Sequence, residues 1–203
     1  MKKIIFLIFD ICLLLAAIIY AIIKFKKVEG EGWSLGRFDK TIILANGPSL
    51  KTDIERVLKE RIGSEVYVLN YFAFTNYFQQ IKPEYYLLAD RVLWSQHVND
   101  EFRKDNQKLF FDLDKVDWKM NIVCPEKGFK WVSERLRENN NIKVLRVNSV
   151  NVEFKSEKIN LFALNQNITT PHFINGLVMM LWHAIYRKRS NIEIYGADFS
   201  LFK

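Results

Sequence analysis

Cysteine and histidine are scarce in this chain of 203 residues, which holds two cysteines and three histidines. Two cysteines cannot form a disulfide framework or a cysteine-rich zinc site. The histidines, His97, His172 and His183, are too scattered to supply metal-ligand spacing. Eight glycines and four prolines exclude collagen-like and low-complexity chains, and 49% hydrophobic content excludes a disordered chain. We therefore expect a folded domain without a metal site.

Positive charge is concentrated at the N-terminus. The net charge is +7, and residues 1–27 contribute +4 of it, through five lysines set against Asp10. The remaining +3 forms no clustered basic face of the kind that nucleic-acid binding requires. One later run, Arg187–Arg189, ends a predicted helix, where we expect it to be solvated and to complement the helix dipole. Nucleic acid is therefore not an expected partner.

A long apolar run fills the N-terminal segment. Ile4–Ile23 has about 20 residues, the length of a membrane-spanning helix, and Asp10 is its one charged residue. Lysines flank both ends and no small-residue cleavage site follows, which favours an uncleaved anchor at residues 1–27 over a signal peptide. We expect Asp10 to contact another helix, with a functional intramembrane carboxylate as the alternative. The prediction is a single-pass membrane protein with a linker at 28–39 and, since paired cysteines are lacking, a cytoplasmic globular domain.

Residues 40–203 alternate short apolar runs with helical patterns. Such alternation predicts an α/β fold: a Rossmann-like, mostly parallel sheet with helices on both faces. The expected strands are 41–45, 66–70, 85–89, 142–147 and 192–195, with weaker ones at 108–111 and 121–124, and the expected helices are 50–60, 126–138 and 173–187. We interpret this segment as one nucleotide-binding domain.

Small, amide and acidic residues follow the predicted strands, and ligands of parallel sheets bind beyond the carboxyl ends of the strands. Asn46-Gly47-Pro48-Ser49 lies between the first strand and a helix. Gly47 permits close backbone approach, and Ser49 is placed to cap the helix or, with its free N–H groups, to bind an anionic oxygen. The segment is neither a G-x-G-x-x-G loop nor a Walker A loop, and a strand–turn–helix without a ligand stays an alternative.

Three short blocks carry a resemblance to known families. Ile42–Leu50 (IILANGPSL) is similar to the opening strand and Gly-Asn-Gly-Pro-Ser motif of bacterial sialyltransferases of glycosyltransferase family 42, with Ala45 in place of the first Gly. The related domain of flagellar motility accessory factors and hydroxymethylpterin diphosphokinases shares this motif. Val68–Phe72 resembles the second-strand motif, and Ile192–Phe199 resembles the strand that ends in Gly-x-Asp-Phe. The resemblance implies a GT-A-like variant of the Rossmann-like fold over residues 41–200.

The resemblance also implies a donor site for a sugar activated by cytidine monophosphate, with no metal and no other cofactor. Asn46, Gly47 and Ser49 would line its phosphate and ribose. Asn70 would hold the nucleotide or the leaving phosphate, and Asp198 with Phe199 would close around the base and ribose. The implied site residues, in chain order, are Asn46, Gly47, Ser49, Asn70, Asp90, Thr170, Asn175, Gly176, Gly196, Asp198 and Phe199, with Thr169 as an alternative to Thr170.

Catalytic residues are harder to assign. The catalytic base of the family is a His beyond the Asp-Phe motif, and this chain ends at Lys203, so we expect the base and part of the domain to lie outside it. We therefore expect nucleotide binding with little or no sugar transfer. His172, in the polar loop before the last helix, is a weak candidate for a base, with a surface or capping role as the alternative. Asp112-Leu113-Asp114 has the letters of a metal-binding motif, but we expect a helix cap or turn there.

These observations predict a membrane-anchored glycosyltransferase of the sialyltransferase type, acting in surface-polysaccharide or glycolipid synthesis. Its partners would be a nucleotide-sugar donor, a glycan or glycolipid acceptor and the membrane. Two alternatives stay open. One is a hydroxymethylpterin diphosphokinase-like enzyme, which would need magnesium and ATP. The other is a truncated, non-catalytic domain that binds nucleotide.

Overall fold

The computed structural model describes residues 2–25, 32–33, 35–36, 38–94, 99–147, 150–173 and 175–198. Its strands are β1 (Lys40–Leu44), β2 (Ser64–Leu69), β3 (Tyr85–Leu87), β4 (Met120–Pro125), β5 (Ile142–Val147) and β6 (Ile192–Tyr195). They form a six-stranded sheet in the order β5-β4-β3-β2-β1-β6. All neighbouring pairs run parallel. The predicted parallel α/β sheet is therefore confirmed.

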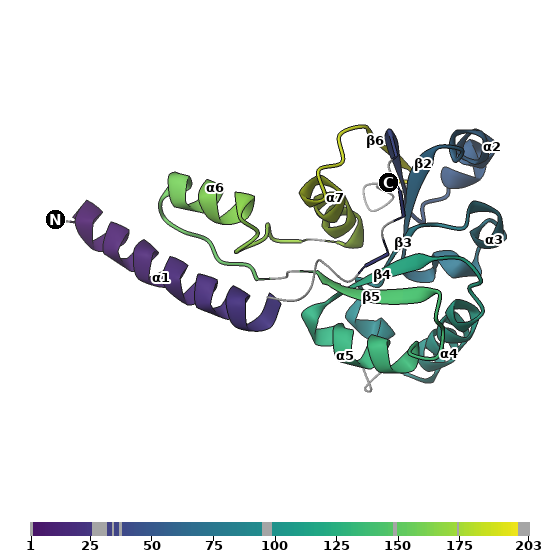
Figure 1. Cartoon of the computed structure of the whole chain (residues 1–203), viewed down its shortest axis with the longest axis horizontal. Coiled ribbons are helices and arrows are strands. Elements are labelled where there is room, and N and C mark those ends of the chain that lie inside the picture. Colours follow the sequence, from purple (N-terminus) through teal and green to yellow (C-terminus); the bar gives the residue numbers. More distant parts are fainter. Residues whose placement is uncertain are drawn as a thin grey trace.

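The strand order creates a switch point between β1 and β6. From β1 the chain moves one strand at a time to β5, and it then returns across the sheet to add β6 on the other side of β1. Since parallel crossovers are right-handed, the two directions of travel place their helices on opposite faces. Figure 1 shows α7 (Gly176–Tyr186) on one side of the sheet, with α2 (Leu50–Glu60) and α4 (Asp100–Asp114) on the other.

The first face of the sheet is the more heavily covered. Its helices are α2, α4 and α5 (Glu126–Arg135), together with the short η1 (Asn70–Phe74), α3 (Phe78–Ile81) and η2 (Arg91–Leu93). Aromatic side chains fill the space between helices and strands, and Phe72, Phe78, Tyr86 and Phe110 are almost fully buried there. The Tyr86 hydroxyl donates to the carbonyl of Asn70 and accepts from the backbone nitrogen of Ala73 at 3.0 Å. This core fixes the start of η1, and with it the position of Asn70.

The second face packs against α7. Met180 and Ala184 of this helix are buried against the apolar side chains of β1 and β2. Tyr67 and Tyr85 stack with their ring centroids 4.5 Å apart, and the ring of His183 lies 5.6 Å from that of Tyr85. His183 is therefore a core residue, but its Nδ1 has no hydrogen-bond partner.

Two expectations about local structure were wrong. Residues 108–111 lie inside α4, which Asn99 caps by accepting a hydrogen bond from the backbone nitrogen of Phe102 at 3.0 Å. Within this stretch the apolar run Leu109–Phe111 has only three residues, and so short a run fits a buried helix face as well as a strand. The run Arg187–Arg189 is not simply solvated: Arg189 donates from Nε and Nη2 to both carboxylate oxygens of Glu65, each at 2.7 Å, and Glu65 is 1% exposed.

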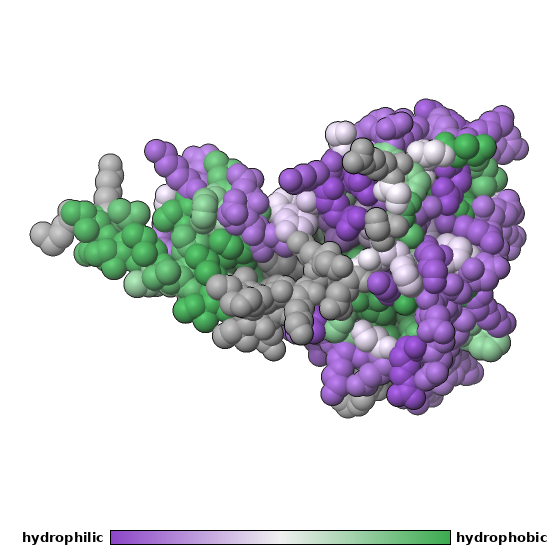
Figure 2. All heavy atoms as spheres, viewed as in Figure 1, coloured by the Kyte–Doolittle hydropathy of each residue, from purple (hydrophilic) through white to green (hydrophobic). Residues whose placement is uncertain are grey.

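The N-terminal helix α1 (Lys2–Phe25) lies beside α6 (Glu157–Asn165), a helix that the sequence pattern did not predict (Figure 1). Asp10 is 1% exposed, and its Oδ1 and Oδ2 accept hydrogen bonds from the backbone nitrogens of Lys155 at 3.0 Å and Ser156 at 2.7 Å. These donors are the N-cap residue of α6 and the residue before it, so Asp10 contacts the backbone at the start of α6 rather than the side of another helix. Most of α1 presents apolar side chains to its surroundings (Figure 2). None of the helices in the described part of the chain is both long and apolar enough to cross a membrane, so the predicted span is not supported.

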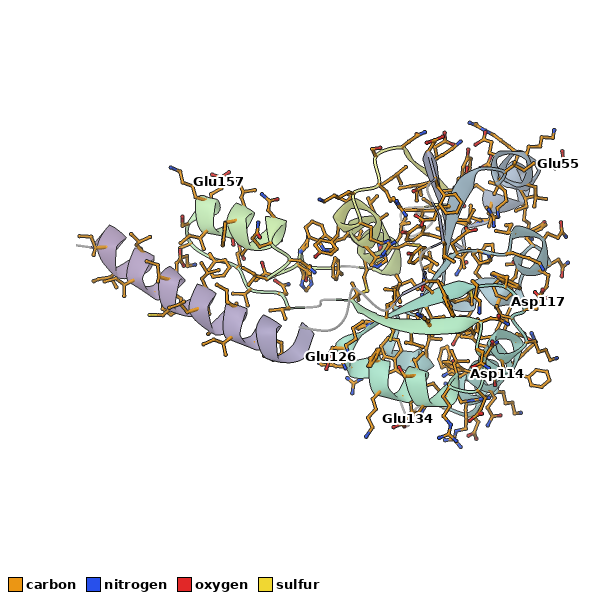
Figure 3. The ribbon with its side chains drawn as sticks, viewed as in Figure 1. Glu55, Asp114, Asp117, Glu126, Glu134 and Glu157 are labelled. Carbon is orange, nitrogen blue, oxygen red and sulfur yellow. The ribbon has the colours of Figure 1, made fainter. Side chains whose placement is uncertain are left out.

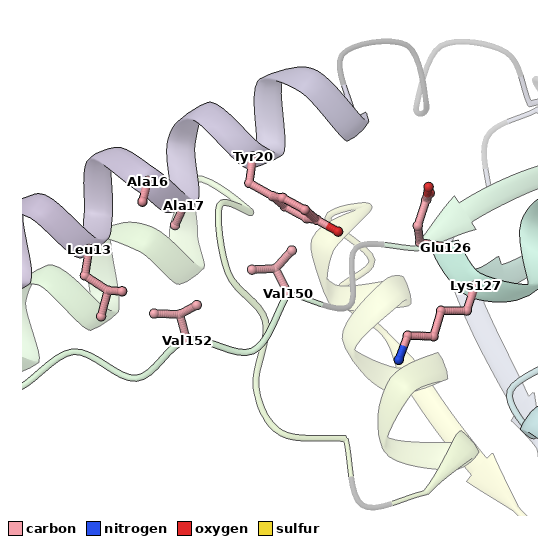
Figure 4. Close-up of a pocket in the computed structure, with 8 residues that line it drawn as sticks. All are labelled: Leu13, Ala16, Ala17, Tyr20, Glu126, Lys127, Val150 and Val152. Carbon is pink, nitrogen blue, oxygen red and sulfur yellow. The ribbon is translucent and has the colours of Figure 1, made fainter.

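A mainly apolar pocket of about 390 Å³ lies between α1 and the globular part (Figure 4). Leu13, Ala17 and Tyr20 of α1 form one wall, and Val150 and Val152 form another. The charged residues at its end come from the start of α5, namely Glu126 and Lys127. The segment at 150–152 therefore lies between the N-terminal helix and the domain.

Candidate functional site

The loops that follow β1 and β6 meet at the switch point. The backbone nitrogen of Ala45 donates to the carbonyl of Tyr195 at 2.9 Å, and that of Gly47 donates to the carbonyl of Gly196 at 2.9 Å. These bonds continue the pairing of β1 with β6 beyond the last ladder pair, Leu44 and Tyr195. The predicted segment Asn46–Ser49 and the Gly-x-Asp segment are thus brought together at the carboxyl edge of the sheet.

Two glycines make this close approach possible. A Cβ atom on Gly47 would lie 2.3 Å from Oδ2 of Asp198 and 2.4 Å from the carbonyl oxygen of Gly196. Gly196 has φ of +67°, and a Cβ there would lie 2.7 Å from the carbonyl oxygen of Ala45. Both positions therefore exclude any larger residue without movement of the backbone.

The side chain of Asp198 lies at the N-terminal end of α2. Its Oδ2 accepts a hydrogen bond from the backbone nitrogen of Ser49 at 2.7 Å. Ser49 is the N-cap residue, as predicted, but its own side chain makes no capping bond. A carboxylate at the positive end of a helix is favourable, so Asp198 takes the role that we expected of the Ser49 hydroxyl. The bond also holds Asp198, the residue expected to bind the ribose, against Ser49, a residue expected to bind the phosphate.

Asn70 and Asp90 form a second polar pair, at the ends of β2 and β3. Asn70 has φ of +50° and is buried. Its Nδ2 donates to Oδ2 of Asp90 at 2.6 Å, and its Oδ1 accepts from the backbone nitrogen of Ala89 at 3.0 Å. Burial raises the pKa of Asp90. Asn46 joins this edge, because its Nδ2 donates to the carbonyl of Leu69 at 3.1 Å. The pairing of Asn70 with Asp90 has no signal in the sequence beyond their positions after neighbouring strands.

The N-terminus of α7 reaches the same edge. Asn175 caps this helix by accepting from the backbone nitrogen of Val178 at 3.0 Å. Gly176 is buried against β2 and β3: an added Cβ would meet the Cβ of Ala89 at 3.0 Å and Nδ2 of Asn70 at 3.7 Å. The helix start thus lies beside the Asn70–Asp90 pair, and its exposed cap residue is one that the resemblance had assigned to the donor site.

The threonines before α7 are engaged elsewhere. Thr169 and Thr170 are both buried, and Thr170 donates from its backbone nitrogen and from Oγ1 to the carbonyl of Val150, at 2.8 and 3.2 Å. Thr170 therefore braces the chain, and its hydroxyl is not turned to solvent. Phe199 lies outside the described residues.

His172 is exposed, and its Nδ1 lies 2.7 Å from Nδ2 of Asn151. With the amide nitrogen of Asn151 as the donor, Nδ1 is the acceptor in this contact. Asn151 is a neighbour that sequence reasoning missed, since a lone Asn in a polar segment carries no specific signal. The ring is thus oriented, but its basic nitrogen is the one that Asn151 occupies.

The carboxylates of the described residues are dispersed over the molecule. Figure 3 shows Glu55 and Glu134 on the outer surface of helices α2 and α5, and Asp117 on the surface loop between α4 and β4. Asp112 and Asp114 lie in the last turn of α4, where they pair with Lys108 at 2.9 Å and Arg135 at 2.8 Å. Among the described residues, no cluster of three metal-ligating side chains occurs. The letters Asp-x-Asp therefore mark a helix end with two surface ion pairs.

Comparison with known proteins gives little beyond the fold. No family profile and no curated protein matches the chain. Among solved structures, it is similar to the MAf glycosyltransferase from Magnetospirillum magneticum AMB-1, with 12% identity and a TM-score of 0.49. The match covers 81% of this chain and 24% of the other, so the chain spans about a quarter of the length of that protein. A similarity this distant identifies no family.

Proposed function

We propose that this chain is the nucleotide-binding domain of a glycosyltransferase of the sialyltransferase type, which takes its sugar from a cytidine monophosphate donor. The observation that carries the proposal is the meeting of three segments at the carboxyl edge of the sheet: the Asn46–Ser49 loop, the Asn70–Asp90 pair and the Gly196–Asp198 turn. The sequence resemblance assigns the donor to these same segments. A topological switch point is also where open α/β sheets bind their ligands.

The chemistry of this edge suits a nucleotide. The Asp198 carboxylate is exposed and can accept the hydroxyls of a ribose, while the N-termini of α2 and α7 favour phosphate oxygens. Because Asp198 holds the N–H of Ser49, a phosphate binds that N–H only when Asp198 turns toward the ribose. The helix N–H groups, rather than a metal ion, would then stabilise the leaving phosphate.

The reaction in this proposal is a direct displacement. An acceptor hydroxyl attacks the anomeric carbon from the side opposite the phosphate, the new C–O bond forms as the bond to the phosphate oxygen breaks, and CMP leaves with the electron pair. The hydroxyl proton passes to a base. In the observed arrangement Asn151 occupies the Nδ1 of His172, so His172 would first have to exchange that hydrogen bond before this nitrogen could take the proton.

We further propose that α1 holds the domain at a membrane, with the domain in the cytoplasm. The apolar run Ile4–Ile23 and its flanking lysines support this. So does the exposure of apolar side chains on α1, where Ile5, Phe6 and Phe9 are each more than half exposed. A surface of this kind is unstable in water unless it is covered. The membrane would place the domain close to a lipid-linked acceptor.

Nucleotide preference tests the proposed function. Saturation-transfer NMR on the full chain in lipid nanodiscs should show CMP bound without added metal, in preference to ATP. An Asn46→Ala variant should weaken CMP binding, because the exposed amide lies at the strand edge, whereas Asp112→Ala, on the far end of α4, should leave it unchanged. Magnesium-dependent ATP binding would contradict the proposal and favour a pterin diphosphokinase-like enzyme.

A separate measurement tests the membrane. Hydrophobic burial is insensitive to salt, so the chain should stay in the membrane fraction through high-salt and carbonate washes. Its release by salt alone would contradict anchoring by α1, and it would leave the nucleotide proposal untouched.

A further inference from the structure

A second hollow lies beside the C-terminal half of α7. It has a volume of about 670 Å³, and its walls are the end of β5, the end of α6 with the turn that follows, and the C-terminal half of α7. Gly176, at the nucleotide edge, and Arg187, in the hollow, are eleven positions apart. At about 1.5 Å per helical residue they are about 16 Å apart along α7. The hollow is therefore separate from the proposed donor site.

Positive charge dominates this hollow. Its lining includes Arg146, Arg187 and Lys188, and no acidic residue is among the described residues that line it. Arg146 pairs with Glu126 at 3.2 Å, whereas neither Arg187 nor Lys188 forms an ion pair with a described carboxylate. The Arg187 guanidinium lies 4.7 Å from the centre of the Tyr85 ring, and its Nε has no hydrogen-bond partner. A concave, basic wall of this kind concentrates anions.

His183, which carries a buried and unpartnered nitrogen, is also among the residues that line the hollow. His183 is only 9% exposed, and its Nδ1 makes no hydrogen bond. Burial, helped by the nearby charges of Arg187 and Arg189, lowers the pKa of His183 to about 3. The ring is therefore neutral at physiological pH, and an unsatisfied buried nitrogen is costly in the absence of a partner. Because this nitrogen is itself buried, a ligand in the hollow would lie beside the imidazole rather than bond to its Nδ1, and the ring would report that the hollow is occupied.

Aromatic and amide side chains complete the lining. Trp182 and Tyr186 are partly exposed on α7, and Asn165 and Asn167 come from the end of α6. Flat aromatic surfaces pack against the C–H faces of sugar rings, and amides both donate to and accept from sugar hydroxyls. An inorganic anion would contact Arg187 and Lys188 but would make no contact with these aromatic and amide side chains.

We propose that the hollow binds an acidic oligosaccharide, with Arg187 and Lys188 on its carboxylate or phosphate groups and Trp182 against a ring face. The role of this saccharide as part of the acceptor rests on the proposed function, because a transferase must hold its acceptor as well as its donor. The site would hold sugar units remote from the reacting hydroxyl, since it lies well away from the donor edge. Its binding does not require donor to be present.

Matched trisaccharides test the proposal on the full chain in nanodiscs. Trigalacturonate should bind at least tenfold more tightly than the neutral maltotriose, and it should shift the imidazole ¹⁵N signals of His183 in histidine-labelled protein. Arg187→Gln and Trp182→Ala should each weaken trigalacturonate binding about tenfold, the size expected for losing one charge-assisted or stacking contact. Arg137→Gln, in the turn after α5, and Phe111→Ala, on α4, change exposed residues away from the hollow; they are the matched controls and should have no effect.

Three outcomes would overturn the inference: equal binding of the two trisaccharides, trigalacturonate binding that leaves the His183 signals in place, or inorganic phosphate binding as tightly as trigalacturonate. The first two exclude an acidic saccharide in this hollow, and the third reduces the hollow to a general anion site. CMP binding, measured on the same samples, reports separately on the proposed function. A variant that keeps CMP binding is folded, so a loss of trigalacturonate binding in it is specific to the hollow.

Discussion

The carboxylate of Asp198 accepts a hydrogen bond from the backbone nitrogen of Ser49 at 2.7 Å, across 149 positions of sequence. This bond joins the turn after the last strand to the start of the first helix of the domain. It exists because β6 returns to lie beside β1, which brings their two loops to one point. At the switch point, the Asp198 carboxylate thus joins two loops of the protein, and the proposed ligand would bind the same carboxylate.

Ser49 and Asp198 should differ in what they contribute to stability. An N-cap serine replaced by alanine usually costs about 1 kcal/mol. Here Ser49→Ala should change the free energy of unfolding by less than about 0.5 kcal/mol, since its hydroxyl makes no cap bond. Asp198→Ala should cost about 1 kcal/mol through loss of a charge at the helix N-terminus. Chemical denaturation of both variants checks this, and an equal loss in the two would contradict it.

Gly47→Ala should disrupt the contact between the two loops. The new methyl group would overlap Oδ2 of Asp198 and the carbonyl oxygen of Gly196, and the second of these is backbone. Overpacking of this kind costs about 1–3 kcal/mol. We expect lower stability in denaturation and weaker CMP binding. A Gly47→Ala protein with unchanged stability and binding would mean that the loops do not approach as closely as the structure has them.

The Glu65–Arg189 pair should be important for folding. Removing one partner of a buried ion pair leaves the other charge uncompensated and costs about 3–5 kcal/mol. Arg189→Gln should therefore destabilise the protein by about 3 kcal/mol, at the lower end because the arginine side chain is 21% exposed. Arg137→Gln is the matched control, since its partner Glu138 is exposed, and it should cost less than about 0.5 kcal/mol. Similar losses of unfolding free energy in the two variants would contradict the assignment of Glu65–Arg189 as a stabilising buried ion pair.

Buried His183 should make the protein sensitive to acid. Its folded-state pKa is lowered from 6.5 to about 3, so between these values the unfolded chain binds a proton that the folded chain does not. Stability from this residue is full above pH 6.5 and falls by up to about 1.4 kcal/mol per pH unit below it. Wild type should accordingly lose stability relative to His183→Phe as the pH falls from 6.5 towards 4. A difference that stays constant with pH would contradict the assignment.

Asp10 should hold α6 in place. Its two oxygens satisfy the backbone nitrogens of Lys155 and Ser156 at the start of that helix. Asp10→Ala should leave these donors unpaired and raise amide hydrogen exchange across 155–165 about tenfold. The sheet strands should keep their protection, which serves as the internal control. If exchange in α6 is unaffected, the helix is held by its other contacts.

Much of the fold follows from local pattern. The strands at 142–147 and 192–195 and the helix Leu50–Glu60 have the predicted bounds, because short apolar runs and a 3.6-residue period are properties of neighbouring residues. The strand expected at 108–111 was wrong because its apolar run is too short to show whether it has the period of a strand or of a helix. Helix α6 was missed because its polar and apolar residues form a weak pattern.

The sequence by itself indicated where the six strands lie, the helices α1, α2, α5 and α7, and the polar residues that follow the strand ends, because these depend on residues a few positions apart. Only the tertiary structure decided which of those residues meet. Asp198 reached Ser49, Asn70 paired with Asp90, Thr170 turned away to Val150, and Asp10 bonded to the start of α6. Each contact joins residues at least 20 positions apart, and their meeting depends on strand order and helix packing, which no local window of sequence contains.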